Sequence, residues 1–520
     1  MRPVVILGLD GAAIDVIDGW VDDGELPNLR RVREEGVYEP MHACLPPVTS
    51  PNWKCYATGR NPGEFGIFWW QNVDFEGERI HYPNDRKFIT PEIWDYLNEN
   101  DQSAGVVNLP IQYPPREVDE FMIAGGPDAE NEGYTNPATL EDRLESEYDW
   151  KVRADTSINE QGMDAVDEII DLIGLRFSVA ADLFEERDLD FLHVTTFHIN
   201  QLQHFLGDHE KTLEGWKRID DALGRFLEQD VNVLLMSDHG SAPIEKIFHV
   251  NTWLERNGFL ELDMNEAVTG FFERVGLTRT RVRAVVNTLG IADALKRVTP
   301  DSMVNSLPEE TGAINQAYAT DLIDWDASVA VASGQGPIYL NPQLSDSGRE
   351  RAITEITEGL ESLTLPGSDA PTVREVRRGD EVYSGRFAAE APDLVLDQGP
   401  GVHVDGDFGG EDLYRDLGEW SMLNARDGIF MGHGPDVQSA SLDDHAEILD
   451  LAPTILHLLD CPVPETLEGR VVTEMFAEGS DPAERPVERV EPGHYDIAAS
   501  GRGDGQALEE RLQDLGYLDQ

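Results

Sequence analysis

The sequence predicts an α/β protein built around buried parallel strands. Apolar, β-branched runs at 4–9 and 231–236 are each closed by an aspartate, in the segments ILGLDG and LLMSDHG. Buried parallel strands have this form when their carboxyl ends carry functional side chains. A helical pattern follows the first run through residues 17–32. With 520 residues, the chain is long enough for more than one domain or for one large α/β domain with insertions.

The chain is acidic along its whole length. It has 100 Asp and Glu residues against 40 Lys and Arg residues, a formal net charge of -60. Such a surface stays hydrated in concentrated salt, where screening weakens the repulsion between like charges. We therefore expect a halophilic source. We expect no nucleic-acid-binding or anionic-membrane-binding surface, because the sequence offers no basic patch.

The few cysteines and the lack of long apolar stretches indicate a cytoplasmic protein. Cys44, Cys55 and Cys461 are too few and too scattered for a disulfide framework or a cysteine zinc site, which fits a reducing compartment. The apolar segment at the start is shorter than a signal sequence, and no later stretch approaches the length of a membrane span. The oligomeric state does not follow from the sequence.

The first strand ends at Asp10, which is either a functional carboxylate or the cap of the next helix. The segment LPPVTSPNWKCYATG at 45–59 then predicts a strand-to-helix junction, with Thr49 beside the free N–H groups of the helix start and Thr49 or Ser50 as its cap. Pro51 suits a first helical turn. A hydroxyl there is a candidate nucleophile, provided that a base or a metal ion activates it.

The middle of the chain continues the pattern of strands and helices. An aromatic cluster at 65–70 is more typical of packing than of a substrate platform, although it follows Thr49 closely. A helix and a strand follow at 90–110, then an irregular polar stretch at 117–164 that we interpret as an insertion over the active face. A long amphipathic helix is predicted from 163 to 187.

Two further strand ends carry polar side chains. Asn200 and His204 are four residues apart, so on a helix they share one face and can converge on one ion. A single histidine is more often a hydrogen-bonded, half-buried ring than a ligand. Asp238 and His239 lie just past the strand at 231–236, and a carboxylate oxygen with an imidazole nitrogen suits a Zn²⁺ ion.

The second half of the chain resumes the core after an insertion. Residues 263–324 have helical character without a strand signal and predict an inserted cap. Strands are expected at GPIYLN, APDLVLD and GIFMGH, and EILDLAPTILHLLD reads as a buried helix. We expect a discontinuous core at 1–262 and 325–478, followed by a polar linker and a C-terminal helix at 479–520.

Taken together, the segments ILGLDG, TSPNW, SDHG, NTWLERNGFL, GPIYLN and APTILHLL resemble, in this order, the alkaline phosphatase superfamily. The similarity is to its type I phosphodiesterase/nucleotide pyrophosphatase branch and spans nearly the whole chain. The resemblance implies an alkaline-phosphatase-like fold, with a large, mainly parallel sheet between helical layers. It also implies two divalent metal ions at the carboxyl ends of the strands, in first place zinc, with Mn or Mg as alternatives.

The resemblance implies a role for each of these residues. One metal would be held by Asp10, the nucleophile Thr49, Asp238 and His239, and Asn52 would contact a phosphoryl oxygen. A metal lowers the pKa of the hydroxyl, Thr49 attacks phosphorus, and water hydrolyses the covalent phospho- or nucleotidyl-enzyme. The substrate would be a small-molecule phosphate ester.

At the second metal site the sequence departs from the family pattern of Asp, His and His. The matching positions are Asn200, His204 and Asn424, so two of the three ligands would be neutral amides, which bind Zn²⁺ weakly. His198 and His433 are candidate substitutes.

These substitutions leave several functions open. The first is a phosphodiester or phosphoryl ester hydrolase with one strong metal site. Others are a one-metal, sulfatase-like hydrolase, a phosphoglycerate mutase, or a catalytically silent binding or scaffold protein.

Overall fold

The computed structural model describes residues 1–83, 89–155, 158–262, 322–408, 410, 412–418, 420–442, 444–491 and 493. Nearly all of the predicted cap at 263–324, and the predicted C-terminal helix, lie outside the described residues. The first part of the predicted linker is described, and it contains α20 (Asp481–Glu484) and β22 (Arg489–Val490). Strand β22 pairs with β21 (Val463–Pro464), so the chain remains part of the fold beyond 478.

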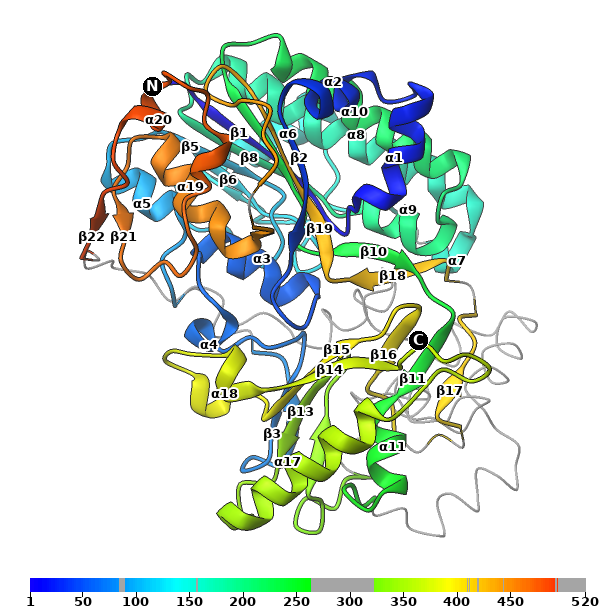
Figure 1. Cartoon of the computed structure of the whole chain (residues 1–520). Coiled ribbons are helices and arrows are strands. Elements are labelled where there is room, and N and C mark those ends of the chain that lie inside the picture. Colours follow the sequence, from blue (N-terminus) through cyan, green and yellow to red (C-terminus); the bar gives the residue numbers. More distant parts are fainter. Residues whose placement is uncertain are drawn as a thin grey trace.

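A nine-stranded sheet forms the centre of the molecule (Figure 1). Its strands in spatial order are β20 (Ala446–Glu447), β2 (Val37–His42), β19 (Asp427–His433), β9 (Asn232–Met236), β1 (Val4–Leu9), β8 (Phe191–Thr196), β5 (Ala104–Val107), β6 (Phe121–Ile123) and β7 (Thr135–Asn136). The run from β9 to β6 is parallel, whereas β19 and β7 are antiparallel to their neighbours. The prediction of a mainly parallel sheet is confirmed.

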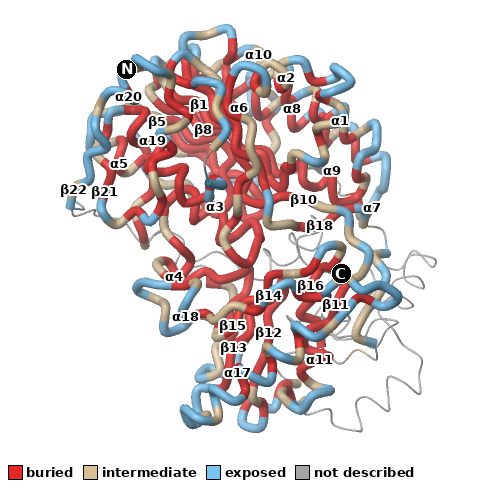
Figure 2. The backbone as a smooth tube through the Cα atoms, in the orientation of Figure 1, coloured by how far each residue is buried: buried red, intermediate tan, exposed pale blue. Residues whose placement is uncertain are grey.

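Helices cover both faces of this sheet, because the central strands are apolar on both sides. In β1, Val5 and Leu7 belong to one buried cluster while Val4 and Ile6 belong to another. The first cluster contains residues of α1 (Ile14–Asp23), α2 (Pro27–Glu35), α6 (Thr139–Tyr148), α8 (Met163–Glu186), α9 (His198–Leu206) and α10 (Glu210–Leu227). The second contains residues of α3 (Thr49–Thr58), α5 (Ile93–Glu99) and α19 (Leu451–Leu458). Figure 2 shows the strands as the buried interior between these layers.

A second, smaller unit has its own sheets and its own apolar cluster. Its sheets are formed by β12 (Ala330–Ala332), β13 (Pro337–Leu340), β14 (Val373–Arg378) and β15 (Leu394–Gln398), and by β11 (Lys246–His249), β16 (Val402–Asp405) and β17 (Tyr414–Arg415). Helices α11 (Val250–Arg256) and α17 (Asp346–Glu361) pack with them. The strands predicted at GPIYLN and APDLVLD exist as β13 and β15. They pair antiparallel with each other outside the central sheet, which apolar content alone could not indicate.

Several contacts join the two units. Strand β10 (Gly240–Pro243) continues from the central sheet and pairs with β18 (Met422–Ala425), through which the chain returns. The Tyr383 hydroxyl, after α18 (Gly379–Val382), donates to the carbonyl of Leu45 at 2.9 Å. Trp69, between α4 (Pro62–Phe65) and the β3–β4 hairpin (Asn72–Asp74, Arg79–His81), donates its indole N–H to Gln335 at 3.0 Å.

The parallel strands end at one edge of the central sheet. Leu9 at the end of β1 pairs with Thr196 at the end of β8, and Gly8 pairs with Met236 at the end of β9. The residues that follow these three ends therefore meet at the same edge, where open α/β sheets bind their ligands. Asp10 and Asp238 are two of them.

A buried ion-pair group fixes α3 to α5. Lys54 and Glu92 are 1% and 0% exposed and form an ion pair, and Glu92 also accepts from Arg116. Arg116 reaches Asp95 at 3.1 Å as well. Four charges are thus balanced inside the protein next to the helix that carries Thr49.

We expect Lys54→Met to lower the free energy of unfolding by about 3 kcal/mol, because the change removes one of the two cations that balance the buried charge of Glu92. Denaturant unfolding in molar salt measures this loss. The double variant Lys54→Met/Glu92→Met should lose less than the sum of the two single variants. Strictly additive losses would show that the pair is not coupled.

Candidate metal centre

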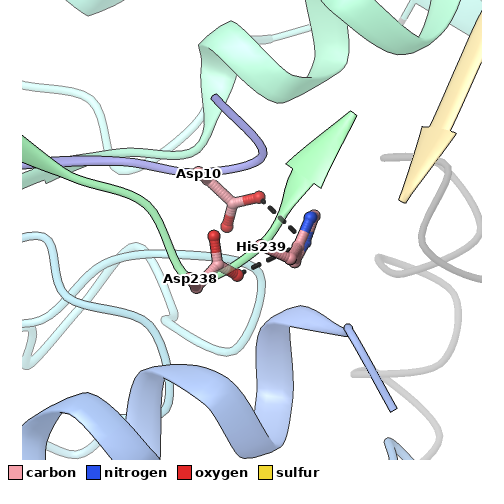
Figure 3. A group of neighbouring side chains, drawn as sticks. All are labelled: Asp10, Asp238 and His239. Carbon is pink, nitrogen blue, oxygen red and sulfur yellow. Dashed lines mark ion pairs between the residues drawn. The ribbon is translucent and has the colours of Figure 1, made fainter. Parts of the chain in front are cut away.

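Asp10, Asp238 and His239 form a compact cluster at the carboxyl edge of the sheet (Figure 3). One ligand atom from each lies within 4.8 Å of the others, and all three side chains are 0% exposed. His239 Nε2 lies 3.3 Å from Asp238 Oδ2 and 3.7 Å from Asp10 Oδ1. The sequence reasoning placed these residues at neighbouring strand ends, and the structure brings them together.

The backbone at the end of β1 holds this cluster in place. Gly11 donates its N–H to Asp238 Oδ1 at 3.1 Å, which ties the ends of β1 and β9 together. Gly11 has a φ of 65°. A Cβ at Gly11 would lie 2.1 Å from Oδ1 of Asn200, so the position requires glycine for both its conformation and its space.

Thr49 is the first residue of α3 and faces the cluster. Its Oγ1 lies 3.2 Å from His239 Nε2, and the residue is 0% exposed. The expectation that Thr49 or Ser50 caps the helix is wrong, because the N-cap is Val48 and no side chain caps this end. Pro51 has no N–H and the N–H of Asn52 donates to the carbonyl of Val48, so Thr49 and Ser50 provide the N–H groups with which this helix start can bind an anion.

The electrostatics of the cluster fit a divalent cation. Two carboxylates are buried together, and in the described part of the chain the ion pairs of Asp238 involve only His239. Burial raises the pKa of Asp238 to about 8 and lowers the pKa of His239. His239 Nδ1 lies 2.8 Å from the carbonyl of Gly240, so Nδ1 carries the proton and Nε2 is left with its lone pair toward the carboxylates. Two carboxylates and one such imidazole are a donor set for Zn²⁺ or a similar ion.

Two neutral donors orient Asp10. Trp53 donates its indole N–H to Oδ2 at 3.1 Å, and Asn200 donates its amide N–H to Oδ1 at 2.8 Å. Sequence reasoning did not identify Trp53, although it lies four residues after Thr49 and so on the same face of α3. Hydrogen bonds of this kind fix the direction in which a carboxylate presents its remaining lone pairs.

The three residues expected at a second metal site lie in a polar network beside the cluster, made of two hydrogen-bonded groups that meet where Ser241 pairs with Asn424 across β10 and β18. His204 Nε2 lies 3.1 Å from Asn424 Oδ1, and burial lowers the pKa of His204 to about 3. The carbonyl oxygen of Asn200 accepts from the Ser241 hydroxyl at 3.2 Å, so its amide nitrogen faces Asp10. Gln203, another residue not anticipated, donates to Ser241 and to the carbonyl of Gly11.

Neither predicted substitute ligand is placed to join this network. His433 lies at the end of β19 and pairs with Val233 near the start of β9, which is the opposite edge of the sheet, and it contacts Glu35 at 3.1 Å. The prediction for His433 is wrong because β19 is antiparallel to β9, so the last residue of β19 lies at the edge opposite the metal cluster. His198 packs its ring against Phe197, and the charged group that acts on it is Arg176 of α8. It turns toward a different side of α9 from His204.

Asn52 takes a structural role in this geometry. Its Oδ1 accepts from the N–H of Cys44 at 2.8 Å, and its Nδ2 donates to the carbonyls of Pro46 and Val48 at 3.0 Å each. The side chain thus holds the segment that leads into α3. These hydrogen bonds engage both the oxygen and the nitrogen of the Asn52 amide. The structure therefore does not support the predicted contact of Asn52 with a phosphoryl oxygen.

The fold and the site define a class of enzyme. A large α/β sheet, two carboxylates and a histidine at its carboxyl edge, and a hydroxyl at a helix start are the parts of a metal-assisted ester hydrolase. The chain belongs to the type I phosphodiesterase/nucleotide pyrophosphatase family, whose model matches residues 4–421. It is therefore a phosphoric ester hydrolase of the alkaline phosphatase superfamily.

Two solved complexes of one enzyme confirm the fold. Phosphonoacetate hydrolase from Sinorhizobium meliloti 1021, in complex with phosphonoformate, superposes with a TM-score of 0.51 at 14% identity, covering 88% of this chain and 95% of that one. Its complex with phosphonoacetate gives the same TM-score of 0.51 at 15% identity and the same coverage, 88% and 95%. Murine ectonucleotide pyrophosphatase/phosphodiesterase 5 has a TM-score of 0.46 at 14% identity, with 92% of this chain and 100% of that chain covered. No curated protein sequence matches the chain.

None of the helices in the described ranges combines the length and the apolar character needed to cross a bilayer.

We expect Trp53→Phe to weaken binding of a divalent cation about tenfold, because the ring still packs while the hydrogen bond to Asp10 is lost. Calorimetric titration of the metal-free protein with Zn²⁺ or Mn²⁺ measures this change. Trp94→Phe is the matched control, since Trp94 is also 0% exposed and lies in the apolar core. Equal affinity in the two variants would show that Trp53 does not orient the ligand.

Proposed function

We propose that the protein hydrolyses small phosphodiesters, with Thr49 as the nucleophile and one firmly bound divalent cation, in first place zinc with Mn²⁺ or Mg²⁺ as alternatives. The observation that carries this proposal is the position of Thr49 Oγ1, 3.2 Å from His239 Nε2 in the cluster of Asp10, Asp238 and His239. A cation held by these residues would lower the pKa of the hydroxyl and offset charge on a phosphoryl group.

The chain's own residues supply the remaining parts of the reaction. Thr49 Oγ forms the bond to phosphorus while the bond to the leaving oxygen breaks, and water then cleaves the threonine phosphate. Helix α3 begins at Thr49, so the N–H groups of Thr49 and Ser50 at its start favour the negative charge on phosphoryl oxygens. The complete burial of Asp10 and Asp238 strengthens these interactions, since little water screens them.

The second metal position is proposed to be weak. Asn200 offers its amide nitrogen to Asp10, and Asn424 is engaged with His204. Neutral amides in this orientation do not balance the charge of a second divalent metal ion. A sulfatase-like, one-metal hydrolase remains the second candidate, because the same site would serve a sulfate ester.

We also propose that the enzyme works in a salt-rich cytoplasm. The support is compositional: a net charge of -60 and only three cysteines, all of them free. Activity assays are therefore designed in molar salt.

Thr49→Ala is expected to reduce hydrolysis of a chromogenic phosphodiester by about a thousandfold or more, because it removes the attacking oxygen. The assay compares this diester with the matching monoester, with Zn²⁺, Mn²⁺ or Mg²⁺ added. Thr58→Ala is the control, since Thr58 is a buried threonine of the same helix whose hydroxyl donates to the carbonyl of Lys54 at 2.6 Å. An active Thr49→Ala variant would eliminate the covalent mechanism, and a silent but folded wild type would favour a binding or scaffold role.

Asn200→Asp with Asn424→His is expected to raise bound metal from about one to about two ions per chain, because the changes replace amides by ligands that hold zinc. Metal analysis after dialysis gives the ratio. Asn251→Asp serves as a control, because Asn251 is buried and bonded to the carbonyls of Ala332 and Gly406 in the second unit. Unchanged metal content in the folded double variant would refute the assignment of these two positions.

A further inference from the structure

Arg176 in the middle of α8 is a cation in the interior of the protein. The residue is 0% exposed, and its Nη2 donates to the carbonyl of Lys151 and, at 2.8 Å, to that of Val152. Its Cζ lies 3.9 Å from the ring centre of Trp150. These contacts position the guanidinium, but carbonyls and an aromatic face offset only part of a full charge.

The described residues provide no carboxylate for this cation. Arg176 forms no ion pair among them, and neither its Nε nor its Nη1 has a hydrogen-bond partner there. Burial lowers the pKa of Arg176 to about 9, and the group that opposes this shift is the Tyr134 hydroxyl. In a chain with 100 acidic residues, a buried arginine without a carboxylate is a marked exception.

Three other buried polar groups near the guanidinium lack hydrogen-bond partners in the described part of the chain as well. Within the described residues, the Tyr134 hydroxyl, Trp150 Nε1 and His198 Nδ1 are buried and form no hydrogen bond. Trp150 is in direct contact with Arg176, and the charge of Arg176 acts on both Tyr134 and His198. The guanidinium and the indole can only donate, and the phenol can donate as well. The species that satisfies them together must accept hydrogen bonds and carry negative charge.

A cavity lies beside this group. Trp150, Lys151 and Val152, which contact Arg176, also line a cavity of about 610 Å³ together with Tyr134. The wall of this cavity carries both signs of charge, from Lys151 and Arg153 and from Glu145, Asp149 and Asp155. The guanidinium thus lies behind the cavity wall.

We propose that the space around Arg176 is a binding site for a small anion, in first place a halide such as chloride. A halide is compact enough for an enclosed site and accepts hydrogen bonds from several directions. It would join α8, the segment at 149–155 and the start of α9 at His198. Because α9 also carries Asn200 and His204, the anion supports the helix that borders the metal cluster without being part of that cluster.

Bromide tests this site in the full-length protein. Crystals grown or soaked in sodium bromide should show an anomalous peak in contact with Arg176 Nε or Nη1. In solution, titration with bromide against a fixed background of a large organic anion should give saturable line broadening in halide NMR. Arg176→Met should lose the peak and weaken bromide binding by at least about tenfold.

Two further variants make the result interpretable. Arg218→Met removes an exposed arginine of α10, whose side chain is 51% exposed, and should leave bromide binding unchanged. Tyr134→Phe removes one donor and should weaken binding severalfold, which keeps the test usable if Arg176→Met does not fold. Displacement of bromide by acetate would identify a carboxylate as the better ligand of the same anion site. Water alone beside Arg176, with no saturable binding in folded wild-type protein, would overturn the proposal.

Discussion

The organisation of the carboxyl edge of the central sheet depends on two carboxylates buried side by side. Asp10 and Asp238 follow adjacent parallel strands, so the sheet forces them together whether or not their charges are balanced. Burial without compensation is unfavourable, as the raised pKa of Asp238 records. The surrounding contacts all fix the orientation of the carboxylates. Gly11, Trp53 and Asn200 donate hydrogen bonds to these oxygens, and His239 turns its lone pair toward them. A divalent cation bound between these groups would complete this arrangement.

The network beside the cluster is held together by neutral side chains. Asn200 donates to Asp10, and Ser241 fixes the direction of its amide. His204 and Asn424 satisfy each other. Every one of these groups is buried and hydrogen-bonded, so the region is built as a neutral polar core.

Much of the fold and the core of the site could be predicted from the sequence, because both follow from strand ends. Asp10, Asp238 and His239 lie just past apolar runs, and parallel strands bring such positions to one edge. What could not be predicted depends on strand direction and on side-chain rotation. His433 follows an apolar run as well, but β19 is antiparallel and takes it to the far edge. Asn52 has the expected position in α3, but its amide turns back to the backbone of the preceding segment. The separate sheet of β12 to β15 required knowledge of pairing that no local pattern contains.

The pairing of β10 with β18 has a consequence for how this protein can change over evolutionary time. The chain leaves the main unit after Pro243 and returns at Met422, and these two residues face each other across the same antiparallel pair. The segment between them therefore begins and ends at neighbouring positions. An insertion of this kind can be lengthened, shortened or exchanged for another module while its anchor points stay fixed. Descendants of this chain can therefore acquire new recognition surfaces by swapping one continuous segment, with Asp238 on one side of the junction and Asn424 on the other left in register.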